Sequence, residues 1–267
     1  MEQPPVIEML PSQTLAKGLR ILNAFSPTRT SWGIRELARE LDMNPATVAR
    51  LVTTLAGAGF LERDPETQRY ALGPAVIKLA NLYMHHNPLP HYARKVFESY
   101  SDRFDYNFYL GTLNGYQVVY LAVLDGRGRI KVMVEPGGST GLHSTALGKI
   151  LLAYQSDSFI NAFINSRLFR AYTETTITDP ETLWAQIHEI RRTGYAVNHG
   201  EHFHDIGAVA APVFNRRQEV VAGVSLAYPR NLIPNLQVNV DNLIPLVREI
   251  ADNISMYVQG DARSHQP

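Results

Sequence analysis

The prolines at positions 88 and 90 constrain the fold of this chain more than any other feature of its 267 residues. Proline has no backbone N–H and its ring clashes with the preceding helical turn, so the segment Asn87–Pro90 cannot lie within a continuous helix. About 85 residues precede this segment and about 180 follow it, and domains usually hold ~100–200 residues. The prolines therefore predict a small N-terminal domain and a larger C-terminal domain, connected by a helical linker with a break.

Composition narrows the class of protein. An apolar content of 45% is typical of globular chains, and the lack of cysteine excludes disulfides and thiolate metal sites. The 25 basic residues balance 25 acidic ones, which excludes a uniformly basic coat, although residues 12–80 hold nine basic against six acidic residues. The apolar stretch Val220–Tyr228 is far shorter than the ~20 residues of a membrane span, and Met1–Leu10 lacks the basic start of a signal peptide. We expect a soluble, cytoplasmic protein with no membrane partner.

The first domain has three helical patterns followed by a hairpin pattern. In the first helix, one face carries Leu15, Ala16, Leu19 and Leu22, which are expected to pack into the core. Asn44 is a good N-cap for the third helix, and Pro45 suits its first position. The expected helices and strands are Leu15–Phe25, Ile34–Leu41, Pro45–Ala58, Phe60–Arg63 and Arg69–Leu72. This order predicts a winged helix-turn-helix.

The outward face of the third helix carries small or hydrogen-bonding residues, one arginine and no acid. Its members are Ala46, Thr47, Ala49, Arg50, Thr53 and Thr54. A helix that enters a DNA major groove needs such a slim face, because bulky or anionic side chains would clash with bases or repel phosphates. The alternative is a three-helix packing domain, whose exposed face would normally carry Glu–Lys pairs. The pattern favours DNA binding.

The second domain alternates strands and helices, which predicts an α+β domain with an antiparallel sheet. Turn and cap residues delimit several elements, among them Asp179 before one helix and Gly194 after it. The expected strands are Tyr106–Leu113, Gln117–Val123, Ile130–Glu135, Ile206–Phe214 and Glu219–Tyr228. The expected helices are Thr145–Ala153, Pro180–Thr193 and about Asn235–Val258.

Six segments in register carry a family resemblance: Ile34–Leu41, Ala46–Leu51, Arg63–Gly73, His143–Lys149, Gly194–Val197 and Ala210–Phe214. With them the chain resembles the IclR family of bacterial transcription regulators over residues 12–258. The resemblance implies a winged helix-turn-helix at 12–73, a helical linker at 74–90 and a GAF-like effector-binding domain at 91–260, with tails at 1–11 and 261–267. The chain departs from the family pattern at Gly33, Asp42, Pro45-Ala46 and Gln68. These departures affect the expected base contacts more than the fold.

The resemblance also implies functional residues. Those expected at DNA are Pro45, Ala46, Thr47, Ala49, Arg50, Thr53, Thr54, Arg63, Gln68 and Arg69, with Thr47 and Arg50 foremost. Arg50 could contact a phosphate or a guanine edge, and Arg69 could equally be a solvated hairpin arginine. Those expected at an effector are Met133, Gly141, Leu142, His199, Ala208, Ser225 and Ala227. Their chemistry suits a small carboxylate with an apolar body, an aromatic acid ahead of a short oxo-acid.

The sequence lacks the usual catalytic patterns. We find no phosphate-binding loop, dinucleotide fingerprint or nucleophile elbow. Ser144 beside His143 could suggest a nucleophile and its base, but adjacent residues do not face each other. The cluster around His199, His202 and His204 could hold zinc, although a polar loop is the favoured interpretation. We expect no enzyme, no metal and no cofactor.

The predicted function is that of a ligand-responsive transcription regulator. A homodimer, or a dimer of dimers, would bind a pseudo-palindromic DNA operator, because a single helix in one groove buries too little to be specific. A small organic acid would act as effector, and an activator would also contact RNA polymerase. The alternative is a constitutive DNA-binding architectural protein whose large domain only oligomerises. An enzyme with an accessory winged helix is less favoured still.

Overall fold

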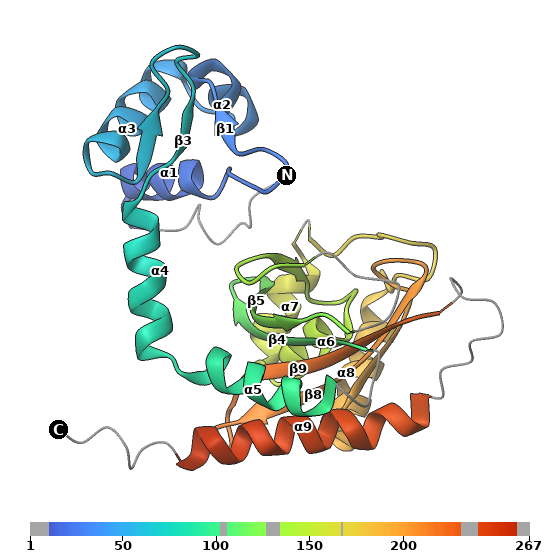
Figure 1. Ribbon diagram of the computed structural model, residues 1–267. Helices are drawn as coiled ribbons and strands as arrows, with labels where there is room; N and C mark the ends of the chain where they lie inside the picture. Colours follow the sequence, from blue (N-terminus) through green and yellow to red (C-terminus); the bar gives the residue numbers. More distant parts are fainter. Residues whose placement is uncertain (1–10, 102–105, 127–133, 167, 231–239, 261–267) are drawn as a thin grey trace. The chain divides into compact units, whose positions relative to one another are not determined.

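The computed structural model describes residues 11–101, 106–126, 134–166, 168–230 and 240–260. The chain divides into two compact units, Met1–Asn87 and Pro88–Pro267 (Figure 1). The division falls between a helix that ends at His86 and another that begins at Leu89. None of the helices in the described part of the chain is both long and apolar enough to cross a membrane.

The N-terminal unit is a winged helix-turn-helix. Its elements are α1 (Gln13–Leu22), β1 (Ser31–Trp32), α2 (Ile34–Glu40), α3 (Pro45–Gly57), β2 (Leu61–Arg63), β3 (Tyr70–Leu72) and α4 (Ala75–His86). The sheet has the order β1-β3-β2, and β1 was not predicted. The Asn44 side chain accepts a hydrogen bond from the Ala46 N–H at 2.8 Å, so the expected cap of α3 is confirmed. Asp42 has φ 50°, the left-handed conformation that the turn between α2 and α3 requires.

Helix α1 packs through only part of the predicted face. Ala16, Gly18 and Ile21 are buried, whereas Leu15 and Leu19 are 62% and 41% exposed. Of the predicted face, Ala16 and the half-buried Leu22 pack against the core, and Ile21 joins them without having been predicted. The core of this unit then gathers around Trp32, Leu37 and Val52. Two leucines of α1 therefore remain on the surface.

The C-terminal unit is built on a six-stranded antiparallel sheet. The strands are β4 (Asn107–Asn114), β5 (Gln117–Leu124), β6 (Ser139–Gly141), β7 (Ala196–His199), β8 (Ile206–Phe214) and β9 (Val220–Pro229), in the order β6-β5-β4-β9-β8-β7. The helices are α5 (Leu89–Ser101), α6 (Ala146–Ala153), α7 (Asp157–Ile164), α8 (Pro180–Thr193) and α9 (Val240–Gly260). This α+β architecture matches the predicted fold class.

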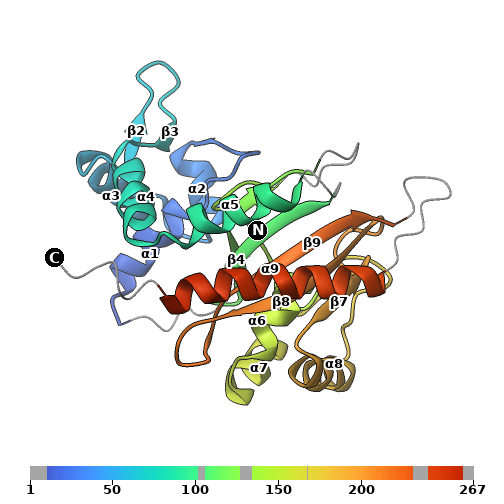
Figure 2. The ribbon, with the colours of Figure 1, turned by 60° about the horizontal axis from the view of Figure 1, so that its bottom comes forward.

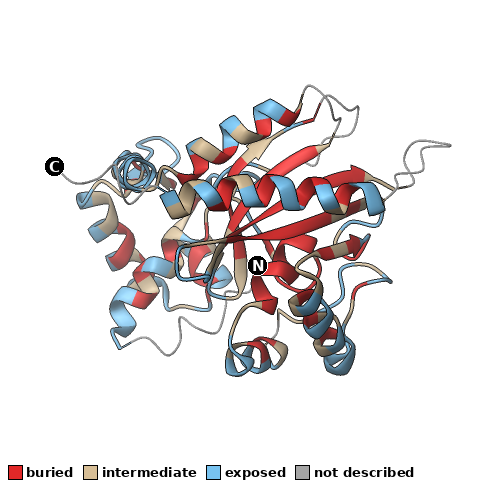
Figure 3. Ribbon diagram, turned by 90° about the horizontal axis from the view of Figure 1, so that it is seen from below, coloured by how far each residue is buried: buried red, intermediate tan, exposed pale blue. Residues whose placement is uncertain are grey.

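The sheet separates two apolar cores. Helices α5 and α9 cover one face, and α6, α7 and α8 cover the other (Figure 2). The strands alternate between the two: Val224 and Leu226 of β9 face α9, whereas Ser225 and Ala227 face the opposite side. The inner strands β4, β8 and β9 are consequently buried over most of their length (Figure 3).

Several elements differ from those expected. The prediction of a strand at Ile130–Glu135 lies largely outside the described residues, and its described end, residues 134 and 135, is not in a strand. The expected start of the last helix at Asn235 also lies outside them, and the described helix begins at Val240. The short elements β6, β7 and α7 were not predicted. Helix α8 and strand β8 have the predicted bounds.

Candidate nucleic-acid interface and ligand pocket

The outward face of α3 is open to solvent. Pro45, Ala46, Arg50, Thr53 and Thr54 are exposed, while Thr47 and Ala49 are half-buried at the edge of this face. The Thr53 and Thr54 hydroxyls donate to the carbonyls of Ala49 and Arg50 at 2.9 and 3.0 Å. Arg50 has no ion-pair partner among the described residues. The face therefore presents methyl groups, two back-bonded hydroxyls and one guanidinium.

The wing is a short hairpin between β2 and β3. The Asp64 carboxylate accepts hydrogen bonds from the Glu66 and Thr67 N–H groups at 2.9 and 2.7 Å, which lowers its pKa. Gln68 has φ 59°, so it occupies a conformation that usually favours glycine. The exposed Arg63 guanidinium lies 5.9 Å from the centre of the Tyr70 ring. The tip of the wing thus holds one cation, Arg63, that no carboxylate of the described residues pairs.

Arg69 is held by Glu36, the third residue of α2. Its two terminal nitrogens donate to the two Glu36 oxygens at 2.7 and 3.2 Å, and it also donates to the Ser31 hydroxyl and carbonyl. These bonds, together with the Gly33 N–H and Arg29, lower the pKa of Glu36 to about 2. The guanidinium predicted for the wing surface therefore links β3 to α2 and β1.

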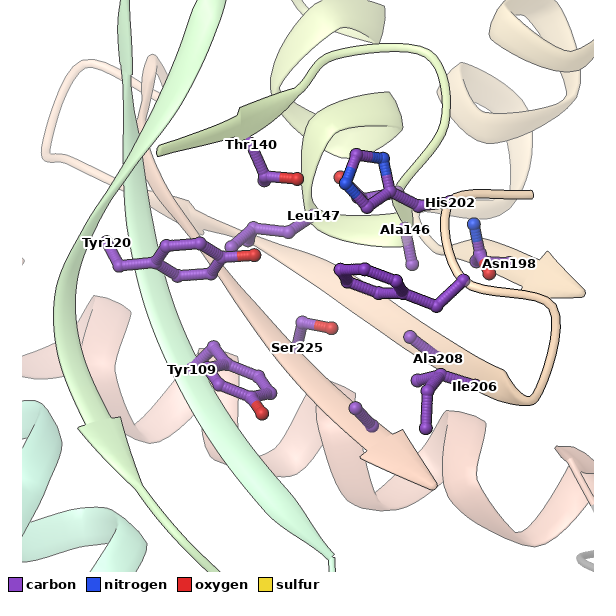
Figure 4. Close-up of a pocket in the computed structure, with 13 residues that line it drawn as sticks. Tyr109, Tyr120, Thr140, Ala146, Leu147, Asn198, His202, Ile206, Ala208 and Ser225 are labelled. Carbon is purple, nitrogen blue, oxygen red and sulfur yellow. The ribbon is translucent and has the colours of Figure 1, made fainter. Parts of the chain in front are cut away.

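A pocket opens on the face of the sheet that carries α6, at the N-terminal end of this helix (Figure 4). Every strand of the six-stranded sheet contributes to it, together with the loop between β7 and β8. The lining residues are Tyr109, Tyr120, Thr140, Thr145, Ala146, Leu147, Asn198, His202, Phe203, Ile206, Ala208, Ser225 and Ala227. Its volume is about 470 Å³ with the mouth included.

Small side chains on β8 and β9 create this space. Ala208, Ser225 and Ala227 stand where larger residues would fill the gap between the sheet and α6. Further along β9, a Cβ on Gly223 would lie 2.8 Å from the Leu147 side chain, so the helix closes tightly on the sheet there. The packing is therefore dense beneath the body of α6 and open at its N-terminal end.

The polar groups of the pocket stand on two sides. Figure 4 shows Tyr109 and Tyr120 on one side and His202 and Asn198 on the other, with Ser225 on the floor between them. Burial raises the pKa of Tyr120 to about 12 and that of Tyr109 further still, so both phenols are neutral. None of the described residues that line the pocket is an Asp, Glu, Lys or Arg.

A buried ion pair braces the loop over the pocket. Lys149 of α6 donates to both Glu201 oxygens at 2.8 and 2.9 Å and to the Gln186 amide oxygen at 3.1 Å. Burial lowers the pKa of Lys149, and the Glu201 charge opposes that shift. The Thr173 and Thr176 hydroxyls donate to the carbonyls of Gly200 and Glu201. The loop that carries His202 and Phe203 is thereby tied to α6 and to residues 173–176.

The structure brings together only part of the expected effector site. Ala208, Ser225 and Ala227 line the pocket, whereas Met133 lies outside the described residues. Gly141, Leu142 and His199 do not line it. A Cβ on Gly141 would face the Ser144 and Tyr172 hydroxyl groups, and the Leu142 side chain is buried in the core.

His199 misses the pocket because strand residues alternate between faces. Asn198, one position earlier, pairs with Ala208 in the β7–β8 ladder, and both residues line the pocket. His199 is exposed instead. The sequence prediction also missed Tyr109, Tyr120, Thr140 and His202 as pocket residues. The two tyrosines lie in strands that were predicted, but which face of a strand meets the pocket depends on its packing against α6.

The catalytic and metal alternatives find no support in this geometry. The Ser144 hydroxyl bonds to His202 Nδ1 at 2.8 Å rather than to its neighbour His143, and Ser144 is fully buried. His143 Nε2 bonds to the Arg170 carbonyl, and burial lowers the pKa of this histidine to about 4. A search of the described residues finds no cluster of three metal-ligating side chains, so His199, His202 and His204 are not brought together as ligands there.

Both units match models of one protein family. The model of the IclR helix-turn-helix domain matches residues 14–65, and that of the bacterial transcriptional regulator IclR C-terminal region matches residues 81–256. The chain belongs to the IclR family of bacterial transcription regulators. It is therefore a DNA-binding transcription regulator with an effector-binding domain, and not an enzyme.

Relatives of similar length support this assignment. The chain is 30% identical over 241 residues to the transcriptional regulator BhcR of Paracoccus denitrificans, covering 90% of this chain and 86% of the relative. A crystal structure of an IclR regulator from Silicibacter sp. TM1040 is 32% identical, with a TM-score of 0.82, covering 92% of this chain and 96% of that one. An IclR homologue from Microbacterium hydrocarbonoxydans, solved with 4-hydroxybenzoate, shares the fold at 23% identity and a TM-score of 0.75, covering 92% and 98%.

Proposed function

We propose that this regulator binds a pseudo-palindromic operator as a homodimer, or as a dimer of dimers, and changes its operator affinity when a small organic acid enters the pocket. The exposed, acid-free face of α3 is the observation that carries the DNA-binding half of this proposal. Arg50 and the methyl groups of Ala46 and Thr53 meet base edges or phosphates. Arg63 contacts the DNA backbone or the minor groove. Arg69 positions the wing through Glu36 instead of contacting DNA itself.

Unpartnered apolar residues on α4 support the oligomer. None of the 12 residues of this helix is buried, and five large apolar side chains are exposed on it: Ile77, Leu79, Leu82, Tyr83 and Met84. A groove lies along Pro74, Ile77, Lys78, Asn81, Leu82 and His85. Contiguous exposed apolar surface usually marks an interface, and a symmetric dimer would place two copies of α3 one helical turn apart, or a multiple of it, on DNA.

Replacing Arg50 by alanine is expected to weaken operator binding by ~1–3 kcal/mol, because it removes the only cation on the exposed face of α3. The measurement is fluorescence anisotropy at fixed salt, with an operator selected from a random duplex pool. Loss of discrimination at one base pair would assign Arg50 to a guanine edge, and a salt slope smaller by about one would assign it to a phosphate.

Arg192→Ala in α8 is the matched control, since it removes one positive charge from an exposed site of the other unit. It should leave the affinity within the error of the titration. Equal affinity of Arg50→Ala and the wild type would remove Arg50 from the DNA contacts.

The character of the pocket supports an organic acid as effector. The N–H groups of Ala146 and Leu147 belong to the first turn of α6, which favours an anion, and the alanines of β8 and β9 suit an apolar body. The enclosed part of this space has room for about four water molecules. A homologue of the same fold was solved with 4-hydroxybenzoate. A polar cavity also favours a sensor over an architectural protein whose large domain only oligomerises.

Ser225→Leu is expected to abolish most of the ligand-induced rise in Tm, because a leucine on the floor would fill the pocket. For the wild type, an acid at ~100 times its Kd adds about 2.7 kcal/mol, which raises Tm by about 5–10 °C. Thermal shift with benzoate, 4-hydroxybenzoate and pyruvate measures the effect. Ser158→Leu on the exposed side of α7 is the control. An equal response of Ser225→Leu and the wild type would exclude this pocket.

Regulation requires only a modest coupling free energy between effector binding and operator binding. An effector that favours one arrangement of the dimer by ~1–3 kcal/mol changes operator affinity about 5–150-fold. Repression follows if the operator overlaps a promoter, and activation requires contact with RNA polymerase. Operator affinity that stays constant with every acid bound by the pocket would contradict this coupling.

A further inference from the structure

The described residues that line this pocket supply no full positive charge to balance a carboxylate. None of the thirteen lining residues is a lysine or arginine, and the first turn of α6 supplies only a partial charge. Burying an ionised carboxylate without a counter-charge is costly. Among the described residues that line the pocket, His202 is the only one that can become cationic near neutral pH.

The bonding of His202 suits either protonation state. Its Nδ1 lies 2.8 Å from the Ser144 hydroxyl, and its ring lies 4.5 Å from the Tyr172 ring. A hydroxyl can donate to a neutral nitrogen or accept from a protonated one by rotating its hydrogen. Ser144 can therefore remain bonded to His202 whether or not the ring is charged.

The neighbouring charged groups are bonded elsewhere. Lys149 pairs with Glu201, and the His204 ring lies 3.1 Å from Glu174 and 3.0 Å from Asp205. His143 is neutral because it is buried, and the phenols Tyr109 and Tyr120 are neutral across the pocket. The Arg170 guanidinium lies 5.6 Å from the centre of the Tyr172 ring. No carboxylate among the described residues bonds to His202.

We propose that binding of the acid effector is coupled to the uptake of one proton by His202, so that the carboxylate is held by an imidazolium. This inference rests on the proposed acid effector. Burial lowers the pKa of His202, so the empty pocket holds a neutral ring at pH 7. A bound anion favours the protonated ring and raises its pKa.

Proton uptake makes the affinity for the acid depend on pH. The complex holds one proton more than the free protein between the two pKa values of His202, so affinity rises as pH falls through that interval. Within that interval the Kd of the full-length protein should rise about five- to tenfold per pH unit, with the limit set by one proton. The acid itself stays ionised throughout this range.

The test is isothermal titration calorimetry of the full-length protein with benzoate, 4-hydroxybenzoate and pyruvate. Titrations at pH 7.4 in phosphate and in Tris, which differ in ionisation enthalpy, give the number of protons taken up. We expect a value near one for the wild type and near zero for His202→Gln, whose Kd should vary less than twofold between pH 6.5 and 8. His204→Gln, in the same loop and exposed, should keep the wild-type uptake.

Acid binding without proton uptake by the wild type would overturn the coupling and leave the acid effector intact. Uptake that persists in His202→Gln, or is lost in His204→Gln, would also overturn it. If none of the three acids binds at pH 6.5 or 7.4, the effector proposal and this inference both fail. The wild-type result needs no variant, so misfolding of His202→Gln cannot obscure it.

Discussion

Replacing Lys149 by methionine is expected to destabilise the C-terminal unit by about 3–5 kcal/mol, because the Glu201 carboxylate is left buried without its partner. Both side chains are almost fully buried, at 1% and 6% exposure, so water cannot replace the lost ammonium. The loop with His202 and Phe203 is anchored through Glu201. Acid binding should therefore weaken together with stability.

Urea unfolding followed by Trp184 fluorescence measures this loss in the unit concerned. The chain has two tryptophans, and Trp184 lies in α8 while Trp32 lies in the N-terminal unit. A Trp32→Phe background makes Trp184 the single reporter. A free energy of unfolding within 1 kcal/mol of that background would contradict the prediction.

A second substitution separates the unpaired charge from the lost packing. In Lys149→Met with Glu201→Gln, no carboxylate remains at the site, so more than half of the lost stability should return. The single variant should also be less affected at pH 5 than at pH 8. An unpaired buried carboxyl has a raised pKa, and its penalty appears only as pH rises above the unfolded-state pKa.

Gly148→Ala is expected to destabilise the same unit by about 3 kcal/mol, because the added methyl group has no space. A Cβ there would lie 2.3 Å from the Gly141 carbonyl oxygen and 2.5 Å from that of Leu142. Both atoms belong to the backbone, so a side-chain rotation cannot relieve the clash. Helix α6 would have to move away from β6, which displaces Thr145, Ala146 and Leu147 at the edge of the pocket.

The matched control is Gly18→Ala, also inside a helix but with no atom within 4 Å of the added Cβ. Alanine favours a helix over glycine by ~1 kcal/mol, so this variant should be neutral or stabilised. Trp32 reports on it in a Trp184→Phe background. Equal effects of the two substitutions would show that the close approach of α6 and β6 does not control stability.

Local sequence patterns predicted the helices best. The caps of α3 and α8 act on backbone groups within one turn, so Asn44, Pro45, Asp179 and Gly194 could be interpreted without distant residues. The strands β6 and β7 have three and four residues, too few for alternation to stand out. Their existence depends on pairing with β5 and β8.

The direction of side chains was harder to predict than the elements. Whether residue 198 or 199 enters the pocket depends on how β7 pairs with β8, and the prediction was one position out. Leu15 and Leu19 of α1 were predicted to pack with Ala16, but the approach of the core buried Gly18 and Ile21 instead of these two leucines. Both errors concern the approach of another segment, which periodicity does not contain.

The sequence by itself determined the order of the helices in the N-terminal unit, their caps and the acid-free outward face of α3. These features depend on contacts within a few residues. Only the tertiary structure decided the partners of the charged residues and the membership of the pocket. Arg69 meets Glu36 at a separation of 33 residues, and Lys149 meets Glu201 at 52. A buried charge takes whichever partner the packing brings to it, so its role cannot be determined until distant strands and helices have come together.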